Sequence, residues 1–185
     1  SEMCIRDREE WDYQLTKDTI GGTIYKVWWE KTIIEILKPY IGEELLKPYF
    51  GYCPFELNRL FKLYQEKPQE LSKLLLKTLQ DTITFLSEKI SPNHEKWKWG
   101  TLHQLTLAHP FSSGNEQAKI LNIGPFKVGG DTNTINNGYY NPFNDHAVSV
   151  APSFRQLHDL SDWRKSLWVI PGGQSGLPFH KHYND

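Results

Sequence analysis

The chain has 185 residues, enough for one domain, or a tightly joined pair, with a buried core. Charged residues make up 23% and the formal net charge is −1, so no field of one sign is expected to attract nucleic acid or an anionic membrane. There is no long apolar run and no basic start followed by an apolar segment, so we expect neither a membrane span nor a signal peptide in this sequence. Cys4 and Cys53, the only cysteines, permit one disulfide but fit no disulfide framework and no zinc pattern.

Residues 1–92 are expected to be mainly helical, because apolar side chains recur there at spacings of three and four. Helices are predicted over residues 20–37, 54–64 and 71–90, forming an antiparallel cluster. The first should end before Pro39. The last should begin near Pro68 and stop at Ser91-Pro92, since proline suits the first turn of a helix but not its interior. Prolines and glycines punctuate the segment between the first two helices.

Residues 93–185 differ in character, with all seven histidines and nine of the thirteen glycines. Short apolar runs separated by turn residues predict strands near residues 102–107, 119–123, 146–150, 153–160 and 166–170. The run at 153–160 partly alternates, which is typical of a strand with one face in water. It should pair with the next run as a hairpin. Residues 133–144 are predicted to form a loop. The fold class predicted is α+β, a helical N-terminal half followed by a half rich in antiparallel strands.

A glycine-rich turn, Pro171-Gly172-Gly173-Gln174-Ser175-Gly176, follows the last predicted strand. Glycine alone enters positive φ freely, so these residues predict a constrained backbone path. Ser175 is not expected to be a nucleophile. The nucleophile elbow needs a glycine two residues to either side of the serine, and Gly176 follows it directly. A backbone turn held by Gln174 and Ser175 is the favoured interpretation.

Histidines near the end of the chain raise the question of a metal. His180 and His182 share one face if the backbone is extended, and Asp159 or Asp185 could complete a ligand set, as in a small metallohydrolase. The spacing fixes no third ligand, so hydrogen-bonded surface or packing histidines are favoured instead.

Residues 129–133, Gly-Gly-Asp-Thr-Asn, invite comparison with a calcium loop. Ile135 stands where a third oxygen ligand belongs, which argues against it. We expect a tight turn in which Asp131 caps backbone N–H groups. His103 and His109 flank a strand-like run and are expected to tie one element to a backbone carbonyl.

An alternative function is that of a stand-alone binding module. Tyr139, Tyr140, Phe143 and Trp163 could form an aromatic platform for a sugar or an apolar acyl group.

Four groups of motifs carry a family resemblance. In chain order they are Trp11-Asp12 with Gly21-Gly22-Thr23-Ile24-Tyr25 and Trp28; Trp97-Lys98-Trp99-Gly100-Thr101-Leu102-His103 with His109-Pro110; Asn122-Ile123-Gly124-Pro125-Phe126 with Gly129-Gly130-Asp131 and Thr134-Ile135-Asn136; and Ser153-Phe154-Arg155 with Asp159-Leu160, the glycine-rich turn and His182-Tyr183. Together they cover nearly the whole chain. They resemble the C-terminal part of the β chain in the penicillin acylase (penicillin amidase) family of N-terminal-nucleophile hydrolases.

The resemblance implies part of an αββα sandwich, with residues 1–92 and 93–185 packed as one fragment of a larger domain. It implies a hydrolase that cleaves the amide bond of β-lactams, acyl-homoserine lactones or similar acylated molecules. In that family the nucleophile is a Ser or Cys exposed by self-cleavage, and its own α-amino group serves as the base. The partners implied are the α chain and the N-terminal part of the β chain, and the precursor is implied to be periplasmic or extracellular.

The resemblance transfers no catalytic residue to this sequence, so the chain alone is expected to be inactive. Ser1 is followed by a charged segment rather than an apolar strand, which argues against it as the nucleophile. Members of the family often bind a structural calcium, but its ligands have no match here, and no cofactor is expected in this chain. Asp131, Asn136 and Arg155 are the candidates for residues that position the active site without touching the substrate. Arg155 would hold the Gly-Asp turn in place by a charge-assisted hydrogen bond.

Overall fold

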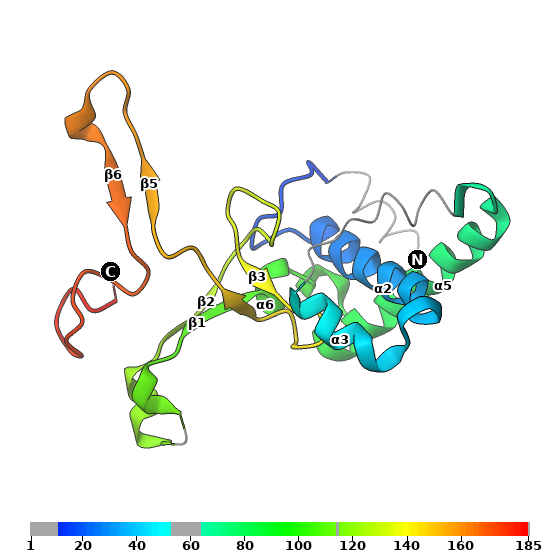
Figure 1. Cartoon of the computed structure of the whole chain (residues 1–185), viewed down its shortest axis with the longest axis horizontal. Helices are drawn as coiled ribbons and strands as arrows, with labels where there is room; N and C mark the ends of the chain where they lie inside the picture. The colour runs from blue at the N-terminus through cyan, green and yellow to red at the C-terminus, as the bar shows by residue number, and fades with distance from the viewer. Residues whose placement is uncertain (1–10, 53–63, 114, 185) are drawn as a thin grey trace.

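A computed structural model describes residues 11–52, 64–113 and 115–184. Helices dominate the first half and strands the second, so the α+β class predicted from the sequence is confirmed. The main helices pack together at one end, the small sheet lies beside them, and a hairpin projects away from this body (Figure 1). No helix in the described ranges is long and apolar enough to cross a membrane.

Helix α2 (Gly21–Ile41) runs through the centre of the helical body. Thr19 accepts the N–H of Gly22 at 3.1 Å through its hydroxyl, which satisfies one of the free donors of the first turn. The predicted end before Pro39 is wrong, because the helix continues through the proline to Ile41. Proline removes one backbone donor there, but Gly42, at φ 75°, closes the helix with its own N–H on Lys38 O at 3.0 Å.

Helix α3 (Glu43–Tyr52) occupies the segment in which no helix was predicted, with Pro48 inside it. Two glutamates in its first turn stabilise the helix, because their negative charges lie at the positive end of its dipole. Leu46 and Phe50, four residues apart, are buried against α2. Tertiary packing therefore outweighs the cost of the proline. The helix predicted over 54–64 lies, but for its last residue, outside the described part of the chain.

Helix α5 (Pro68–Lys89) confirms the clearest helical pattern of the sequence, including the proline in its first turn. Its apolar stripe packs on α2, and Leu86 lies in one core with Ile24, Val27 and Trp97. The α2–α5 contact also contains polar groups, since Thr78 shares a hydrogen bond of 2.9 Å with Thr32 of α2. Shorter helical turns are η1 (His94–Lys96), α6 (Trp99–Leu102), η2 (Pro110–Ser112), η3 (Gln117–Leu121) and η4 (Trp163–Lys165).

A four-stranded sheet with the order β2-β1-β4-β3 lies next to the helices. Its strands are β1 (Gln104–Leu107), β2 (Ile123–Lys127), β3 (Tyr139–Tyr140) and β4 (Val148–Val150). The β1–β2 and β3–β4 pairs are antiparallel, and β1–β4 is parallel. Two strand-level predictions are wrong. The run at 119–123 is mostly the turn η3, and the predicted loop 133–144 contains β3, which is too short to be recognised from its own sequence.

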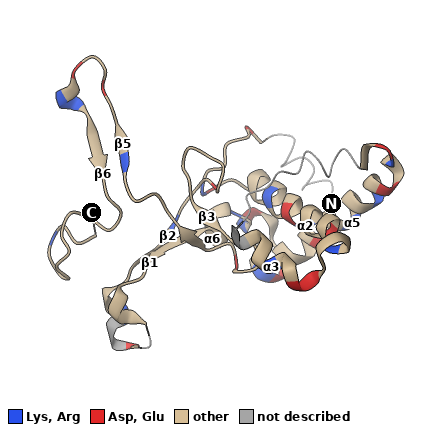
Figure 2. Ribbon diagram, viewed as in Figure 1, with Lys and Arg blue, Asp and Glu red and all other residues tan. Residues whose placement is uncertain are grey.

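The predicted hairpin is confirmed as β5 (Arg155–Leu157) and β6 (Leu167–Val169), paired antiparallel. At its tip Asp162 accepts the N–H of Arg164 at 3.2 Å and starts the turn η4. The prediction of one wet face is wrong, since all six strand residues are exposed. In Figure 2 the hairpin ribbon is mostly tan, with charged residues near its tip and on β5, whose one basic residue is Arg155.

Candidate functional site

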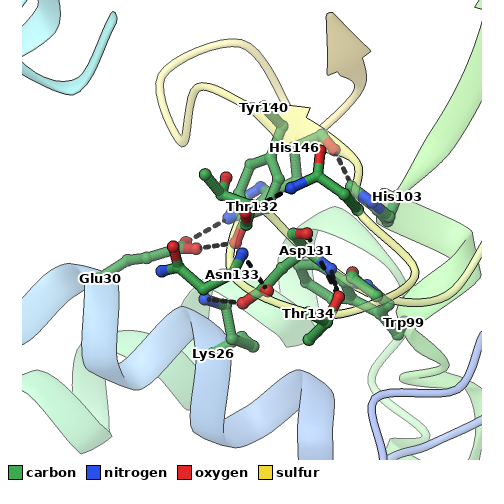
Figure 3. Close-up of polar contacts among 12 residues, drawn as sticks. Lys26, Glu30, Trp99, His103, Asp131, Thr132, Asn133, Thr134, Tyr140 and His146 are labelled. Atoms are coloured by element: carbon green, nitrogen blue, oxygen red, sulfur yellow. Dashed lines mark hydrogen bonds and ion pairs between the residues drawn. The ribbon is translucent and has the colours of Figure 1, made fainter. Parts of the chain in front are cut away.

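Buried polar side chains gather where α2 meets the loops around β3 and β4 (Figure 3). We call this group the buried polar cluster; its members are Lys26, Glu30, Trp99, His103, Asp131, Tyr140 and His146. Helix α2 contributes the first two, α6 and the residue after it the next two, and the loop and strand region after β2 the remainder. Polar groups are seldom buried unless they are paired, so each contact here carries information.

Glu30 is the centre of the cluster and is only 3% exposed. Its Oε2 lies 2.7 Å from Nε2 of His146, and its Oε1 accepts the hydroxyl of Tyr140. The two partners follow it by 116 and 110 residues. Both carboxylate oxygens are therefore occupied by side chains of the C-terminal half, and the residue acts as a clamp between α2 and that half.

The charges around Glu30 keep it ionised despite its burial. Burial alone would raise the pKa of this carboxyl, but His146, Lys26 and the hydrogen bond from Tyr140 together hold the pKa below its ordinary value. Burial, and then the charge of Glu30, raise the pKa of Tyr140 well above the usual range, so the phenol remains a donor. Glu30 is therefore an anion that accepts two hydrogen bonds, and the phenol of Tyr140 is a neutral donor to it.

His103 is completely buried and stacks on Trp99 with ring centroids 4.9 Å apart. Its Nδ1 donates to the carbonyl of His146 at 3.0 Å, which confirms the predicted tie to a backbone carbonyl and fixes the tautomer. Burial lowers the pKa of this imidazole, so the ring is neutral. Its Nε2 is buried without a partner among the described residues, and a Cβ at Gly138 would lie 3.0 Å from it.

Asp131 forms the turn that the sequence predicts, and its capping role is confirmed. Its Oδ1 accepts the N–H of Asn133 at 2.8 Å, and its own N–H donates to Thr134 Oγ1 at 2.8 Å. The cation that faces its carboxylate is Lys26, with Nζ 2.6 Å from Oδ2. The neighbouring Gly130 has φ 80°, and its carbonyl accepts the Nε1–H of Trp99 at 2.8 Å. The turn is therefore attached to both α2 and α6.

Asn136 and Arg155, the other two candidates, lie at the edge of this turn. Asn136 closes it by donating from Nδ2 to Gly129 O at 2.9 Å. Arg155 reaches the same loop only at Asn137, whose carbonyl accepts from Nη2 at 3.4 Å. Asn136 and Arg155 also line a groove of about 450 Å³ between the sheet and the hairpin. The structure thus brings Asp131 and Asn136 together, whereas Arg155 does not contact the Asp131 carboxylate.

The glycine-rich turn has the backbone that its sequence predicts. Gly172 and Gly173 have φ values of 87° and 78°. Ser175 N–H donates to His182 O at 2.9 Å, and its hydroxyl accepts the N–H of Leu177 at 3.2 Å. Ser175 is therefore a turn residue, in agreement with the spacing argument.

The residues of the metal hypothesis are spread over two places. His180 and His182 are neighbours with ring centroids 5.5 Å apart, on the exposed end of the chain. Asp159 instead accepts from the backbone and side chain of Ser161 at 2.8 and 2.6 Å. In the ranges that the structure describes, no group of three or more His, Cys, Asp or Glu side chains could hold a metal ion.

The predicted aromatic platform is wrong. Tyr140 is 5% exposed, and its hydroxyl is bound to Glu30. Tyr139 donates its hydroxyl to Phe50 O, and Phe143 packs edge-on against the Phe50 ring. Trp163 lies apart from them at the tip of the hairpin. Tyr139 and Phe143 pack against α3, and Tyr140 packs against α2 and α6, so these rings do not form one exposed surface with Trp163.

Lys26 and Glu30 were missed by the sequence analysis. A signal existed, because Glu30 follows Ile24 and Val27 at helical spacing and so falls on the apolar side of the first predicted helix. A carboxylate at such a position must find buried partners. The chain contains many possible partners, and nothing in the sequence selects Tyr140 and His146.

Comparison with known proteins matches residues 7–185 to the penicillin amidase family. The chain belongs to this family. An acyl-homoserine lactone acylase QuiP of Pseudomonas aeruginosa is 26% identical over 132 residues, a match that covers 64% of this chain and 16% of that protein. The penicillin acylase 2 proenzyme of Pseudomonas sp. strain SE83 is 35% identical over 89 residues, which is 47% of this chain and 11% of the proenzyme. The chain thus spans only a small part of the length of these relatives.

Proposed function

We propose that this penicillin amidase family chain is the C-terminal segment of the β chain of an amidohydrolase. The enzyme would cleave the amide bond of an acylated small molecule such as an acyl-homoserine lactone or a β-lactam. The observation that carries the proposal is the family match over residues 7–185 together with the small share, 11–16%, of the relatives that the chain spans. The names of those relatives supply the two substrate classes.

We assign this segment a supporting role and no nucleophile. The buried polar cluster favours this assignment, because its central carboxylate has both oxygens occupied and its side chains are enclosed. Such an arrangement fixes the position of backbone segments but offers no group to a substrate. Asp131 and Asn136 hold the turn at residues 129–136, and the groove beside it, lined by Asn136 and Arg155, would form part of the wall of the substrate cleft.

The proposal is tested by the reading frame upstream of this sequence and by the activity of its product. We expect a long frame with a Gly-Ser or Gly-Cys self-cleavage junction, visible by mass spectrometry as a new N-terminus. The complete product should hydrolyse an acyl-homoserine lactone or a penicillin, whereas the 185-residue chain alone should not. Hydrolysis by the isolated chain, or a complete product that cleaves neither amide, would overturn the proposal.

The role of Arg155 is tested in the same complete enzyme. Arg155→Ala should impair maturation or turnover, because it removes the donor to the loop that Asn136 closes. Lys67→Ala is the control, since that cation lies outside the hairpin, is 64% exposed and pairs with the similarly exposed Glu70 one turn along α5. If both variants mature, unfold and turn over like the parent, Arg155 has no supporting role.

A further inference from the structure

We infer that the β5–β6 hairpin is a docking surface for the polypeptide that precedes this chain in the same enzyme. The inference rests on the proposed function and deepens it by assigning the surface through which the two parts meet. Its first basis is exposure: Leu157, Leu167 and Val169, which share one face, are 73%, 67% and 45% exposed, and Trp168 on the other face is 67% exposed. Soluble proteins rarely leave such a contiguous apolar patch in water unless it is an interaction site.

The strand register places large apolar side chains on both faces of the hairpin. Leu157 is paired with Leu167, and Arg155 with Val169, so these four side chains share one face. Trp168, paired with Gln156, lies on the opposite face. An antiparallel ribbon with one face in water would instead alternate between apolar and polar residues. This ribbon therefore matches a sheet that is covered on both sides.

A groove of about 830 Å³ adjoins the hairpin and extends the apolar surface. Leu157, Leu167 and Val169 line it on one side and Ile135, which is fully exposed, on the other. Among the described residues, each hairpin strand pairs only with the other, so each has an outer edge without a paired strand. Such an edge can accept a further strand, and two isolated strands are only marginally stable in water.

The length of the relatives identifies the occupant. Because this chain spans 11–16% of them, most of a family polypeptide is available to cover the hairpin. A second copy meeting this hairpin through a two-fold axis would bury one face and leave the other in water. A small ligand in the groove, which Trp168 also lines, would leave the outer backbone edges of both hairpin strands unpaired. Polypeptide that encloses the ribbon satisfies both faces and both edges.

The experiment uses the 185-residue chain and the preceding polypeptide from the same reading frame, expressed separately and mixed. Binding is measured by sedimentation velocity, and protection of residues 155–169 by hydrogen exchange. We expect a one-to-one complex with at least tenfold slower exchange across the hairpin. Leu167→Glu should weaken the complex at least tenfold. Leu76→Glu, which alters a leucine of equal exposure (69%) on α5, should not.

Leu167 is exposed, so its substitution should leave the helical circular dichroism of the free chain unchanged, and wild-type exchange provides a second readout that needs no variant. The inference is overturned if Leu167→Glu binds like the parent or if the hairpin remains unprotected in the complex. It is also overturned if the chain dimerises through the hairpin and the preceding polypeptide does not displace that dimer. A hairpin-dependent complex that cleaves no amide would contradict the proposed function but would still support the docking surface.

Discussion

The replacement of Glu30 by glutamine removes the charge at the centre of the buried polar cluster and little else. Removing one partner of a buried ion pair costs about 3–5 kcal/mol when the other is left unpaired. Glutamine avoids part of this cost. Its carbonyl can still accept from Tyr140, but its amide can donate to His146 Nε2 only if the ring proton moves to Nδ1, which is buried without a hydrogen-bond partner among the described residues. A hydrogen bond to a charged group contributes about 1.5–3 kcal/mol and a neutral one about 0.5–1.5 kcal/mol. Two such bonds change, so we expect Glu30→Gln to lower the free energy of unfolding by about 1–3 kcal/mol.

The measurement is urea unfolding of the 185-residue chain at pH 7, followed by far-ultraviolet circular dichroism. For a chain of this size the loss corresponds to a melting temperature lower by about 2–12 °C. Glu35→Gln is the matched control, because Glu35 lies on the same helix and pairs with the exposed Lys77 at 2.5 Å. Surface pairs contribute little, so the control should remain close to the parent. Equal losses for the two variants would refute the view that Glu30 is a clamp.

Three further changes test the same region by urea unfolding. Tyr140→Phe leaves one oxygen of Glu30 without its donor and should cost about 1–3 kcal/mol; a variant as stable as the parent would contradict the hydrogen bond. Gly130→Ala should destabilise strongly, because φ is 80° and the new Cβ would lie 1.9 Å from a backbone oxygen, whereas Gly176→Ala, with nothing within 4 Å, should not. Because the pKa of His103 is lowered in the folded chain, its contribution is complete above the ordinary value of 6.5 and is lost as the pH falls through and below it. His103→Gln, whose amide can still donate to the carbonyl, should flatten that part of the profile; an unchanged profile would contradict the assignment. The lowered pKa of Glu30 adds a second loss below its ordinary value of 4.5, toward its folded pKa.

Local patterns predicted the elements whose stability is mostly local. Helix α5 has a long apolar stripe and a proline in its first turn, and the β5–β6 hairpin is bounded by turn residues. Helix α3 was missed because Pro48 is a strong local signal, whereas the burial of Leu46 and Phe50 against α2 is a tertiary effect. The wet face predicted for 153–160 failed for a related reason. The alternation was weak because β5 carries Arg155 beside Leu157 on one face and Gln156 on the other, and all three residues are exposed.

The residues of the candidate site also differ in whether their partners are close to them in the sequence. Asp131 could be recognised as a capping residue because its partners lie within three positions of it. Glu30 could be recognised only as a carboxylate on an apolar face, since the residues that satisfy it lie more than a hundred positions away. Its partner His146 has a φ of 62°, a backbone conformation that the sequence gives no reason to expect.

The position of Glu30 also bears on how the two halves of the chain depend on each other. A buried carboxylate without partners is costly, so α2 can adopt its observed environment only when Tyr140 and His146 are in place. Conversely, Tyr140 and His146 need an acceptor that only α2 supplies. The apolar contacts between α2 and α5 could form within the first half alone, but this polar contact could not. The turn at Asp131 and the groove beside it therefore take their observed positions only when α2 is in place.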